Sequence, residues 1–361
     1  MTDVYVIAEA GVNHNGELKR ALAMVDAASE TGADAVKFQT FLPAALASKH
    51  AVQANYQIRN QADSQDDGDS QLTMLHRLAL SFADHHALLT HCAKCNIEFL
   101  SSPFDLISAR FLLEELALPR LKLGSGELTN GPLLLQIAQS GRQLILSTGM
   151  ATLHEIREAL GVIAFGLLQD STPPSRTTFR DAFAQPQAQA LLKKHVTLLH
   201  CTTEYPCPLD KVNLRAMDTL AETFALPTGY SDHTLGIHVS LAAVARGAQL
   251  IEKHFTLDRQ LPGPDHLVSL EPDELKTMID GIRDISRALG SADKAPTPEE
   301  KNNMSVARKS LVAAQAIRRG DTFTTENVTI KRPGSGRSPM DYWAILGQTA
   351  RQNYDADEVI S

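Results

Sequence analysis

The chain has 361 residues, a length that fits one large domain followed by a small one. Its formal net charge of −8 argues against a nucleic acid or an anionic membrane as partner, although an anionic substrate needs only a local positive pocket. The N-terminal sequence lacks the features of a signal peptide, and no apolar run reaches about 18 residues. The four cysteines are too few for a disulfide scaffold, so we expect a reduced, cytoplasmic protein.

Short apolar runs alternate with helix-like segments from residue 3 to about 287. Amphipathic helices are expected at 18–32, ending at Gly32, and at 107–118. Eight strands with helices between them are what a (β/α)₈ TIM barrel requires. A doubly wound open sheet also alternates in this way, but polar strand ends spread over the whole set favour the closed barrel. The expected strands are 4–10, 34–40, 97–103, 120–125, 143–148, 196–202, 227–232 and 249–255.

Polar side chains stand at the end of every expected strand. In a (β/α)₈ barrel these ends converge on one mouth, where the active site lies. Loops also begin with polar residues, so a part of this set is structural. The polar ends are Glu9, Lys37, Gln39, Ser101, Ser102, Lys122, Ser125, Glu127, Ser147, Thr148, His200, Thr202, Ser231, Asp232, His233, Glu252, Lys253 and His254.

Two polar excursions interrupt the alternation, at 48–72 and at 166–194. The first carries the acidic run "DDGD" and is typical of a lid, whereas the second suggests no function. Small, charged and proline residues predict a linker at 288–304. The linker separates a barrel domain, 1–287, from a small domain of short strands and a glycine-rich loop, 305–361.

Two histidines close the last two expected strands. Neighbouring strands should place His233 and His254 at one edge of the mouth, and imidazole is the commonest metal ligand. Together with nearby carboxylates they suit a Mn²⁺ or Mg²⁺ ion with open water positions. A hydrogen-bonded histidine pair without metal is the alternative. The candidate carboxylates are Glu9, Asp232, Glu252 and Asp265.

Two lysines, Lys37 and Lys122, end the second and fourth expected strands on the same side of the barrel. With the hydroxyls and glycines of "KLGSGE" and "LSTGM" they describe a cradle for phosphate or carboxylate. Two alternatives stay open. The lysines could extend from strand ends into solvent, or one of them could form a Schiff base with a substrate.

The segment "HCAKC" places Cys92 and Cys95 three residues apart in a helical stretch. A finger-type zinc site needs a second cysteine pair, which does not follow. We therefore interpret this segment, and the neighbouring 84–91, as an ordinary solvated helix.

Seven motifs, in order, resemble the sialic acid synthase family, which includes N-acetylneuraminate synthases and their bacterial legionaminate and pseudaminate relatives. They are "AEAGVNHNG", "AVKFQTF", "LGSGE", "LSTGM", "HCTTEYP", "GYSDHTLG" and "EKHFTLD…PGPDH". The resemblance extends to "ARKSLVA" and "KRPGSG" of the family's antifreeze-like (SAF) domain. It implies a (β/α)₈ barrel with an SAF domain, in a homodimer where each SAF domain caps the partner's barrel.

The resemblance also implies the reaction. Phosphoenolpyruvate (PEP) condenses with an N-acetylated hexose aldehyde, giving a 2-keto sugar acid and phosphate by C–O cleavage. The enol carbon of PEP is a weak nucleophile, so the aldehyde needs a Lewis acid: a divalent metal on His233 and His254, expected to be Mn²⁺, with Mg²⁺ or Co²⁺ as alternatives. The leading prediction is an N-acetylneuraminate synthase that uses N-acetylmannosamine. The alternative is an N,N'-diacetyllegionaminate synthase that uses 2,4-diacetamido-2,4,6-trideoxymannose, and a pseudaminate synthase is less favoured.

Residue roles follow from the same resemblance. Glu9 and Glu127 are expected, beside the two histidines, to stabilise the cation that forms at C2 or to move protons. Thr203 departs from the asparagine that many sialate synthases carry there.

A competing hypothesis is a different class of protein, a non-catalytic sugar-binding or ice-interacting protein built on the SAF domain. Under the leading hypothesis the site residues divide into two sets. The expected PEP contacts are Lys37, Ser102, Lys122, Ser125, Ser147, Thr203 and Ser231, and the expected sugar contacts are Gln39, Tyr205, Asp265 and Arg332.

Overall fold

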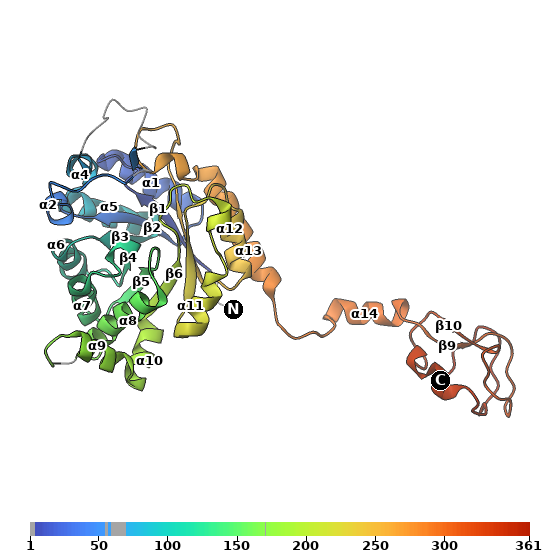
Figure 1. Ribbon diagram of the computed structural model, residues 1–361. Helices are drawn as coiled ribbons and strands as arrows, with labels where there is room; N and C mark the ends of the chain where they lie inside the picture. Colours follow the sequence, from blue (N-terminus) through green and yellow to red (C-terminus); the bar gives the residue numbers. More distant parts are fainter. Residues whose placement is uncertain (1–3, 55–56, 59–69, 170) are drawn as a thin grey trace. The chain divides into compact units, whose positions relative to one another are not determined.

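The computed structural model describes residues 4–54, 57–58, 70–169 and 171–361 (Figure 1). The chain forms two compact units, Met1–Gly290 and Ser291–Ser361. Among the described residues, no helix has the length and apolar character needed to cross a membrane. The acidic run at 66–69, expected at the tip of a lid, lies outside the described residues.

Eight parallel strands form the centre of the first unit, in the order β3-β2-β1-β8-β7-β6-β5-β4. The two ends of this order, β3 and β4, are also neighbours in space, so the sheet closes on itself. The predicted (β/α)₈ barrel is therefore confirmed, and each strand falls within a residue or two of its expected position. The strands are β1 (Tyr5–Gly11), β2 (Ala35–Thr40), β3 (Glu98–Pro103), β4 (Arg120–Leu123), β5 (Gln143–Ser147), β6 (Val196–His200), β7 (Thr228–Asp232) and β8 (Leu250–His254).

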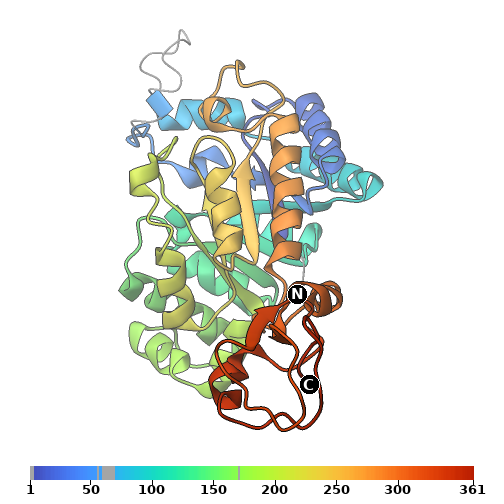
Figure 2. The ribbon, with the colours of Figure 1, turned by 90° about the vertical axis from the view of Figure 1, so that its right-hand side faces the viewer.

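Helices surround these strands (Figures 1 and 2). The helix expected at 107–118 forms as α6 and continues as a π-helical segment, Phe111–Glu115. Figure 2 shows α12 and α13 side by side on the outside of the strands. The helices are α1 (Leu18–Glu30), α2 (Pro43–Leu46), α4 (Gln71–Leu78), α5 (Phe82–Cys95), α6 (Leu106–Arg110), α7 (Gly131–Gln139), α8 (Leu153–Leu167), α9 (Arg176–Phe183), α10 (Pro186–His195), α11 (Ala216–Phe224), α12 (His238–Ala245) and α13 (Pro272–Leu289).

The described part of the excursion at 166–194 is mostly helical. It carries α9 and most of α10, and both pack against α8 on the outside of the barrel. The ring of Phe179 on α9 meets the ring of Phe165 on α8 edge-on, with centroids 5.2 Å apart. The excursion thus extends the helical layer. Its two helices were not predicted because their exposed, polar faces dominate the composition of this stretch.

Alternate residues of each strand point into the barrel. These inward side chains include two layers, one above the other along the strands. The lower layer is an apolar cluster made of Ile7, Ala35, Leu100, Ile145, Leu199 and Leu250. Two residues further along the strands, toward their carboxyl ends, the inward residues become polar. This polar layer consists of Glu9, Lys37, Ser102, Lys122, Ser147, Ser231 and Glu252, all of them buried.

The second unit has its own small core. Strands β9 (Ser310–Ala313) and β10 (Val328–Lys331) pair antiparallel. Helix α14 (Pro298–Ala307) occupies part of the stretch expected to be a linker, capped by Thr297. The unit also contains a short 3₁₀ helix, Pro339–Asp341, and the short helix α15 (Tyr342–Ile345). Its core consists of Leu311, Ala313, Ile317, Phe323, Val328, Ile345, Ala350, Tyr354 and Ile360.

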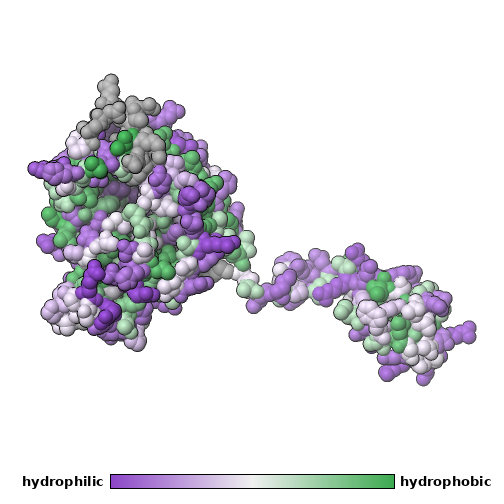
Figure 3. Space-filling model, viewed as in Figure 1, coloured by the Kyte–Doolittle hydropathy of each residue, from purple (hydrophilic) through white to green (hydrophobic). Residues whose placement is uncertain are grey.

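The visible surface mixes residue types. In Figure 3 hydrophilic residues are interspersed with smaller hydrophobic patches on both units. Isolated apolar residues on a surface are normal for a folded protein. The search for a functional site therefore rests on buried polar groups, of which the polar layer is the largest cluster described above.

Candidate active site

Two buried lysines meet the same carboxylate in the polar layer. Lys37 Nζ lies 2.7 Å from Glu9 Oε2 and 3.8 Å from Glu252 Oε2. Lys122 Nζ lies 3.1 Å from Glu252 Oε1, which also accepts a hydrogen bond of 2.8 Å from Ser231 Oγ. Because all five side chains are buried, water screens these contacts weakly. Side chains from five strands thus build one compact charge cluster at the mouth.

Burial affects the two carboxylates of this cluster differently. It raises the pKa of Glu9, because the attraction of Lys37 only partly offsets the cost of burying the charge. Burial also opposes the charge of Glu252, but Lys122 and Lys37 outweigh it and lower the pKa of Glu252. Glu9 is therefore the carboxylate suited to take up and release a proton near neutral pH.

The charge state of Lys37 bears on the Schiff-base alternative. Burial acts to lower its pKa, but Glu252 and Glu9 outweigh burial and raise it. A Schiff base forms only from a neutral amine. Lys37 is thus held as a cation, which suits anion binding and disfavours a Schiff base at this residue.

Serine hydroxyls lie beside the lysines. Lys37 Nζ donates a hydrogen bond of 3.2 Å to Ser102 Oγ. Ser147 on β5 is buried, and its hydroxyl has no hydrogen-bond partner among the described residues. A buried unpaired hydroxyl costs free energy, so it indicates a place where a ligand supplies the missing partner.

His233 and His254 lie together at one edge of the mouth, as predicted. Their ring centroids are 5.6 Å apart. His233 Nδ1 lies 2.5 Å from the carbonyl oxygen of Thr202, whereas His254 Nδ1 has no hydrogen-bond partner in the described part of the chain. Burial lowers the pKa of both rings, that of His233 to about 4. Both imidazoles are therefore neutral at pH 7.

These two imidazoles fit a divalent metal by their donor chemistry. The carbonyl of Thr202 holds a proton on Nδ1 of His233, so Nε2 keeps its lone pair, as in metal-bound histidines. Ser231 Oγ lies 3.5 Å from this Nε2, but its hydroxyl donates to Glu252 at 2.8 Å. His254 adds a buried nitrogen without a partner among the described residues. Within those residues, no Asp, Glu or Cys completes a group of three ligand atoms here, all within 4.8 Å of one another. Water or substrate oxygens would fill the remaining positions, as Mn²⁺ and Mg²⁺ accept.

Two expected sugar contacts, Tyr205 and Gln39, lie beside the histidines. The ring of Tyr205 stacks on His233 at a centroid distance of 4.0 Å and meets His254 edge-on at 5.6 Å. Gly11 has φ +53°, and a Cβ added there would lie 3.4 Å from His254 Cε1 and 3.6 Å from Gln39 Nε2. The glycine keeps this edge of the mouth open, so a ligand can approach both side chains.

Ser125 and Thr203, two expected PEP contacts, form a second corner of the mouth. The backbone N–H of Gly149 donates a hydrogen bond of 2.9 Å to Ser125 Oγ. A Cβ on Gly149 would lie 2.8 Å from Ser125 Oγ and 3.1 Å from Thr203 Cγ2, so a larger residue there would displace these side chains. Thr203 also lines a cavity of about 470 Å³ between the loops after β5 and β6.

A larger cavity, of about 690 Å³, lies outside the barrel among α7, α8 and α9. Its lining includes Leu134, Phe179 and Phe183, and it contains none of the expected site residues. The mouth nevertheless remains the candidate site, because buried charges and unpaired polar atoms indicate chemistry more directly than volume does.

Three expected residues have weaker ties to the charge cluster. Glu127 is half-buried, which raises its pKa, and accepts a hydrogen bond of 2.7 Å from Asn130 Nδ2. Asp265 is buried in the loop after β8, and burial, opposed by the charge of Lys37, raises its pKa to about 6. Arg332 belongs to the second unit, where its Nε donates to a backbone carbonyl 3.0 Å away. The roles of all three stay predictions.

The sequence analysis undervalued Glu252 and misplaced Asp232. Glu252 was only one of four candidate metal carboxylates in the sequence analysis, whereas in the structure it lies between Lys37 and Lys122 and contacts both. The alternation of side chains along a strand could have shown this. Glu252 and His254 are two residues apart and share the inner face, so Lys253 between them faces outward. Lys253 Nζ indeed lies 3.1 Å from Asp232 Oδ2, and neither side chain is exposed. Asp232 is thus on the helix side of the barrel, and its expected place among the metal carboxylates is wrong.

Comparison with known proteins extends these observations. The chain matches the NeuB family over residues 24–294 and the SAF domain over residues 308–361. It is 46% identical to the N,N'-diacetyllegionaminic acid synthase of Campylobacter jejuni, with 100% of this chain and 99% of the relative covered. It is 42% identical to the synthase of the same name from Legionella pneumophila, with 98% and 92% covered.

A solved structure shares the fold. The N-acetylneuraminic acid synthetase of Leptospira borgpetersenii, determined with citrate, is 31% identical, with a TM-score of 0.65, and covers 84% of this chain and 90% of its own. The two relatives named N,N'-diacetyllegionaminic acid synthase are aligned over nearly the whole chain, both units included, which argues against a non-catalytic protein built on the SAF domain. The chain therefore belongs to the NeuB family, the sialic acid synthase family that its motifs predicted, and carries an SAF domain.

Proposed function

We propose that the chain is an N,N'-diacetyllegionaminate synthase, which condenses PEP with 2,4-diacetamido-2,4,6-trideoxymannose. The leading sequence prediction was N-acetylneuraminate, with legionaminate as the alternative. Two relatives named N,N'-diacetyllegionaminic acid synthase match at 46% and 42% identity over nearly the whole chain, whereas the N-acetylneuraminic acid synthetase matches at 31%. This order of similarity supports the alternative.

One observation carries the use of PEP: two buried lysines converge on one carboxylate beside a hydroxyl that lacks a partner among the described residues. PEP has a carboxylate and a phosphate, and its arrival gives Lys37 and Lys122 new anionic partners. Ser102, Ser147 and Ser231 supply hydroxyl donors to the same groups. Burial of the cluster makes each of these contacts stronger than it would be in water.

Glu9 is our candidate for proton transfer. As the new carbon–carbon bond forms, positive charge develops at C2 of the PEP moiety, and a nearby carboxylate stabilises it. Water then attacks C2 and must lose a proton, which a carboxylate with a raised pKa accepts. Glu127 remains a second candidate, since its pKa is also raised, although its side chain bonds to Asn130 and not to the cluster in the described part of the chain.

The metal is part of the proposal. His233 and His254 would hold it, and when bound it would polarise the aldehyde oxygen of the sugar. Gln39 and Tyr205, beside the two imidazoles, would orient the sugar at that point. The homodimer and the reach of Arg332 to the sugar rest on the family resemblance alone.

The test is a comparison of two sugars with the purified full chain. PEP consumption and phosphate release are followed with Mn²⁺ and either N-acetylmannosamine or 2,4-diacetamido-2,4,6-trideoxymannose. We expect kcat/KM to be at least about tenfold higher with the diacetamido sugar, since the two legionaminic acid synthases are more similar to this chain than the N-acetylneuraminic acid synthetase is. Equal rates, or a preference for N-acetylmannosamine, would return the assignment to N-acetylneuraminate. The His233→Ala variant serves as the background control.

A further inference from the structure

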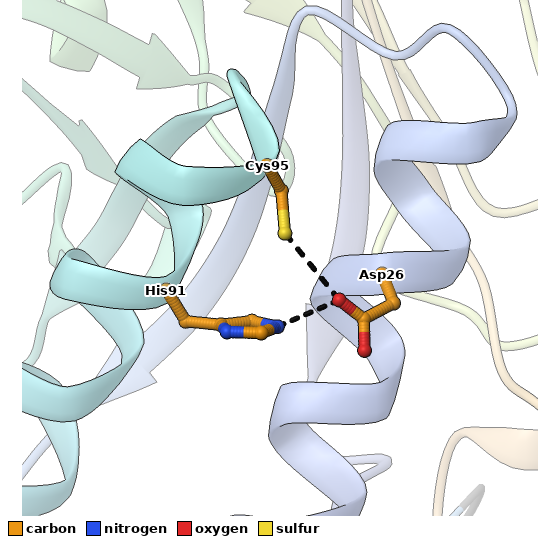
Figure 4. Close-up of side chains that lie close together, drawn as sticks. All are labelled: Asp26, His91 and Cys95. Carbon is orange, nitrogen blue, oxygen red and sulfur yellow. Dashed lines mark hydrogen bonds and ion pairs between the residues drawn. The ribbon is translucent and has the colours of Figure 1, made fainter.

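A second group of side chains of the types that bind metals lies on the outside of the barrel, between α1 and α5. Asp26 projects from α1, and His91 and Cys95 project from α5 (Figure 4). Asp26 Oδ1 lies 2.6 Å from His91 Nε2 and 3.3 Å from Cys95 Sγ. Figure 4 shows all three side chains pointing toward one another across the gap between the helices.

The geometry of this group is that of a ligand set. His91 and Cys95 are four residues apart, which places both on one face of α5. Among the described residues, these three make the single group of at least three His, Cys, Asp or Glu ligand atoms lying within 4.8 Å of one another. Zinc bonds of about 2.0–2.3 Å would hold tetrahedral ligand atoms roughly 3.3–3.7 Å apart. The 3.3 Å contact between Asp26 and Cys95 already has this length, whereas the 2.6 Å contact between Asp26 and His91 would have to lengthen when the ion binds.

The packing of the two helices holds the group in place. Helices α1 and α5 are in direct contact, and Ser29 Oγ of α1 donates a hydrogen bond of 2.7 Å to the carbonyl oxygen of Cys95. This bond fixes the backbone of one ligand relative to the helix that carries another. A site whose ligands are already in position loses less conformational entropy when an ion binds.

We propose that Asp26, His91 and Cys95 bind a zinc ion, with water at the fourth position. One sulfur, one nitrogen and one oxygen donor form a mixed set that suits Zn²⁺, while Mg²⁺, Mn²⁺ and Ca²⁺ prefer oxygen. The thiolate and the carboxylate together balance the charge of the dication. The ion would cross-link α1 to α5 and keep one position open to solvent, because the group is partly exposed.

Two other interpretations of the group compete with a metal site. Partial burial, the hydrogen bond to Asp26 and its negative charge raise the pKa of the Cys95 thiol, so the metal-free protein does not hold a reactive thiolate there, and the thiol loses its proton only when a cation binds. Cys92 does not join the group, since it is buried in the barrel core on another face of α5. A simple hydrogen-bonded contact between two helices is the remaining reading, and a metal titration separates it from a site.

The experiment is a Co²⁺ titration of the full chain after removal of metal, because Co²⁺ replaces Zn²⁺ and its bond to a thiolate absorbs in the near ultraviolet. We expect this charge-transfer band in the wild type, its loss in Cys95→Ser, and at least about tenfold weaker Co²⁺ binding in Asp26→Asn and His91→Gln. His86→Gln, an exposed histidine of the same helix, is the matched control and should titrate like the wild type.

A second variant distinguishes metal binding at this group from metal binding by the two histidines at the mouth. The double variant His233→Ala, His254→Ala should retain the thiolate band, and Zn²⁺ should raise its melting temperature as it does in the wild type. The melting temperature of metal-free Cys95→Ser verifies that this protein is folded. Absence of the band in the wild type, or an undiminished band in folded Cys95→Ser, would overturn the zinc site.

Discussion

Strand β8 carries two buried ionic clusters on its opposite faces, and they differ in how completely they are bonded. On the outer face, Asp232 Oδ1 accepts hydrogen bonds of 2.9 and 2.8 Å from the N–H and hydroxyl of Thr234. Asp232 Oδ2 accepts one of 2.7 Å from Ser240 Oγ and pairs with Lys253, which also donates to the carbonyl of Thr234. Each oxygen of the carboxylate therefore has partners within the chain.

The inner face is left incomplete. Glu252 Oε2, Ser147 Oγ and His254 Nδ1 are buried, and none of them has a hydrogen-bond partner among the described residues. Buried polar atoms are normally satisfied, so this difference is informative. A complete cluster holds strands and helices together, whereas an incomplete one is prepared for a ligand. Burial and ion pairing alone would not have separated the two roles.

Removal of divalent metal should produce the largest effect, confined to the inner face. EDTA should lower turnover by about 10³-fold or more, since loss of a Lewis acid costs several kcal/mol of transition-state stabilisation. Added Mn²⁺ should restore turnover, measured as phosphate release. The Cys95→Ser variant should respond in the same way, because its group lies outside the barrel. Full activity in EDTA would remove the metal from the proposal.

Breaking the outer pair should cost stability in place of activity. Lys253→Met leaves Asp232 as a buried charge without its cation, and we expect a loss of about 3–5 kcal/mol in the free energy of unfolding. Urea denaturation measures this value. The double variant Asp232→Asn, Lys253→Met should recover part of the loss, because it leaves no uncompensated charge. If Lys253→Met keeps its stability but loses turnover, Lys253 belongs to the site and the comparison fails.

Lys37→Met should show the reverse pattern. Glu252 keeps Lys122 and Ser231 as partners. Glu9 loses its cation, but burial already raises its pKa to about 7, so it takes up a proton and leaves no uncompensated charge. We therefore expect the stability to fall by no more than about 1–2 kcal/mol. PEP loses a cation from its binding site, and kcat/KM for PEP should drop by about 10²–10³-fold, as for other preorganised electrostatic contacts. Steady-state kinetics with varied PEP, alongside urea denaturation, measures both effects. A variant that unfolds like Lys253→Met would show that Lys37 is structural.

The fold was readable from the sequence because the strands repeat one pattern. Each strand is a short apolar run that ends in a polar residue. This pattern located the strands even though their apolar residues do not alternate regularly with polar ones. The two helices at 176–183 and 186–195 were missed, since their exposed faces dominate a stretch rich in polar residues. A helix packed by one apolar stripe looks like a loop when its composition alone is considered.

The candidate site was only partly readable. Lysines, serines and histidines at strand ends could be assigned to the mouth, but the partner of each could not, because partners come from different strands. Glu252 pairs with Lys122 across 130 positions of the chain, a link that no local pattern contains. The same limit hid the group at Asp26, whose ligands His91 and Cys95 lie in a segment interpreted as a solvated helix.

A pair of serines provides the finest test of the comparison. Ser240 and Ser147 are both buried, but among the described residues only the hydroxyl of Ser240 has a hydrogen-bond partner, the carboxylate of Asp232. Ser240→Ala should therefore cost about 1–3 kcal/mol of stability and leave the KM for PEP unchanged. Ser147→Ala removes a hydroxyl without a partner among the described residues, so the stability should stay level or rise slightly. Its KM for PEP should increase by about five- to tenfold, the value of one hydrogen bond to an anionic ligand.

Both measurements are needed on each variant, because either one alone fits more than one explanation. A rise in KM with unchanged stability assigns the Ser147 hydroxyl to the ligand. A loss of stability with unchanged KM assigns it to the protein, and the unpaired atoms of the inner face would then lose their meaning as a mark of the binding site. Both serines are buried, and only the hydroxyl of Ser240 has a partner among the described residues. Their contrast therefore tests the distinction between the inner and outer clusters with a small change in side-chain volume.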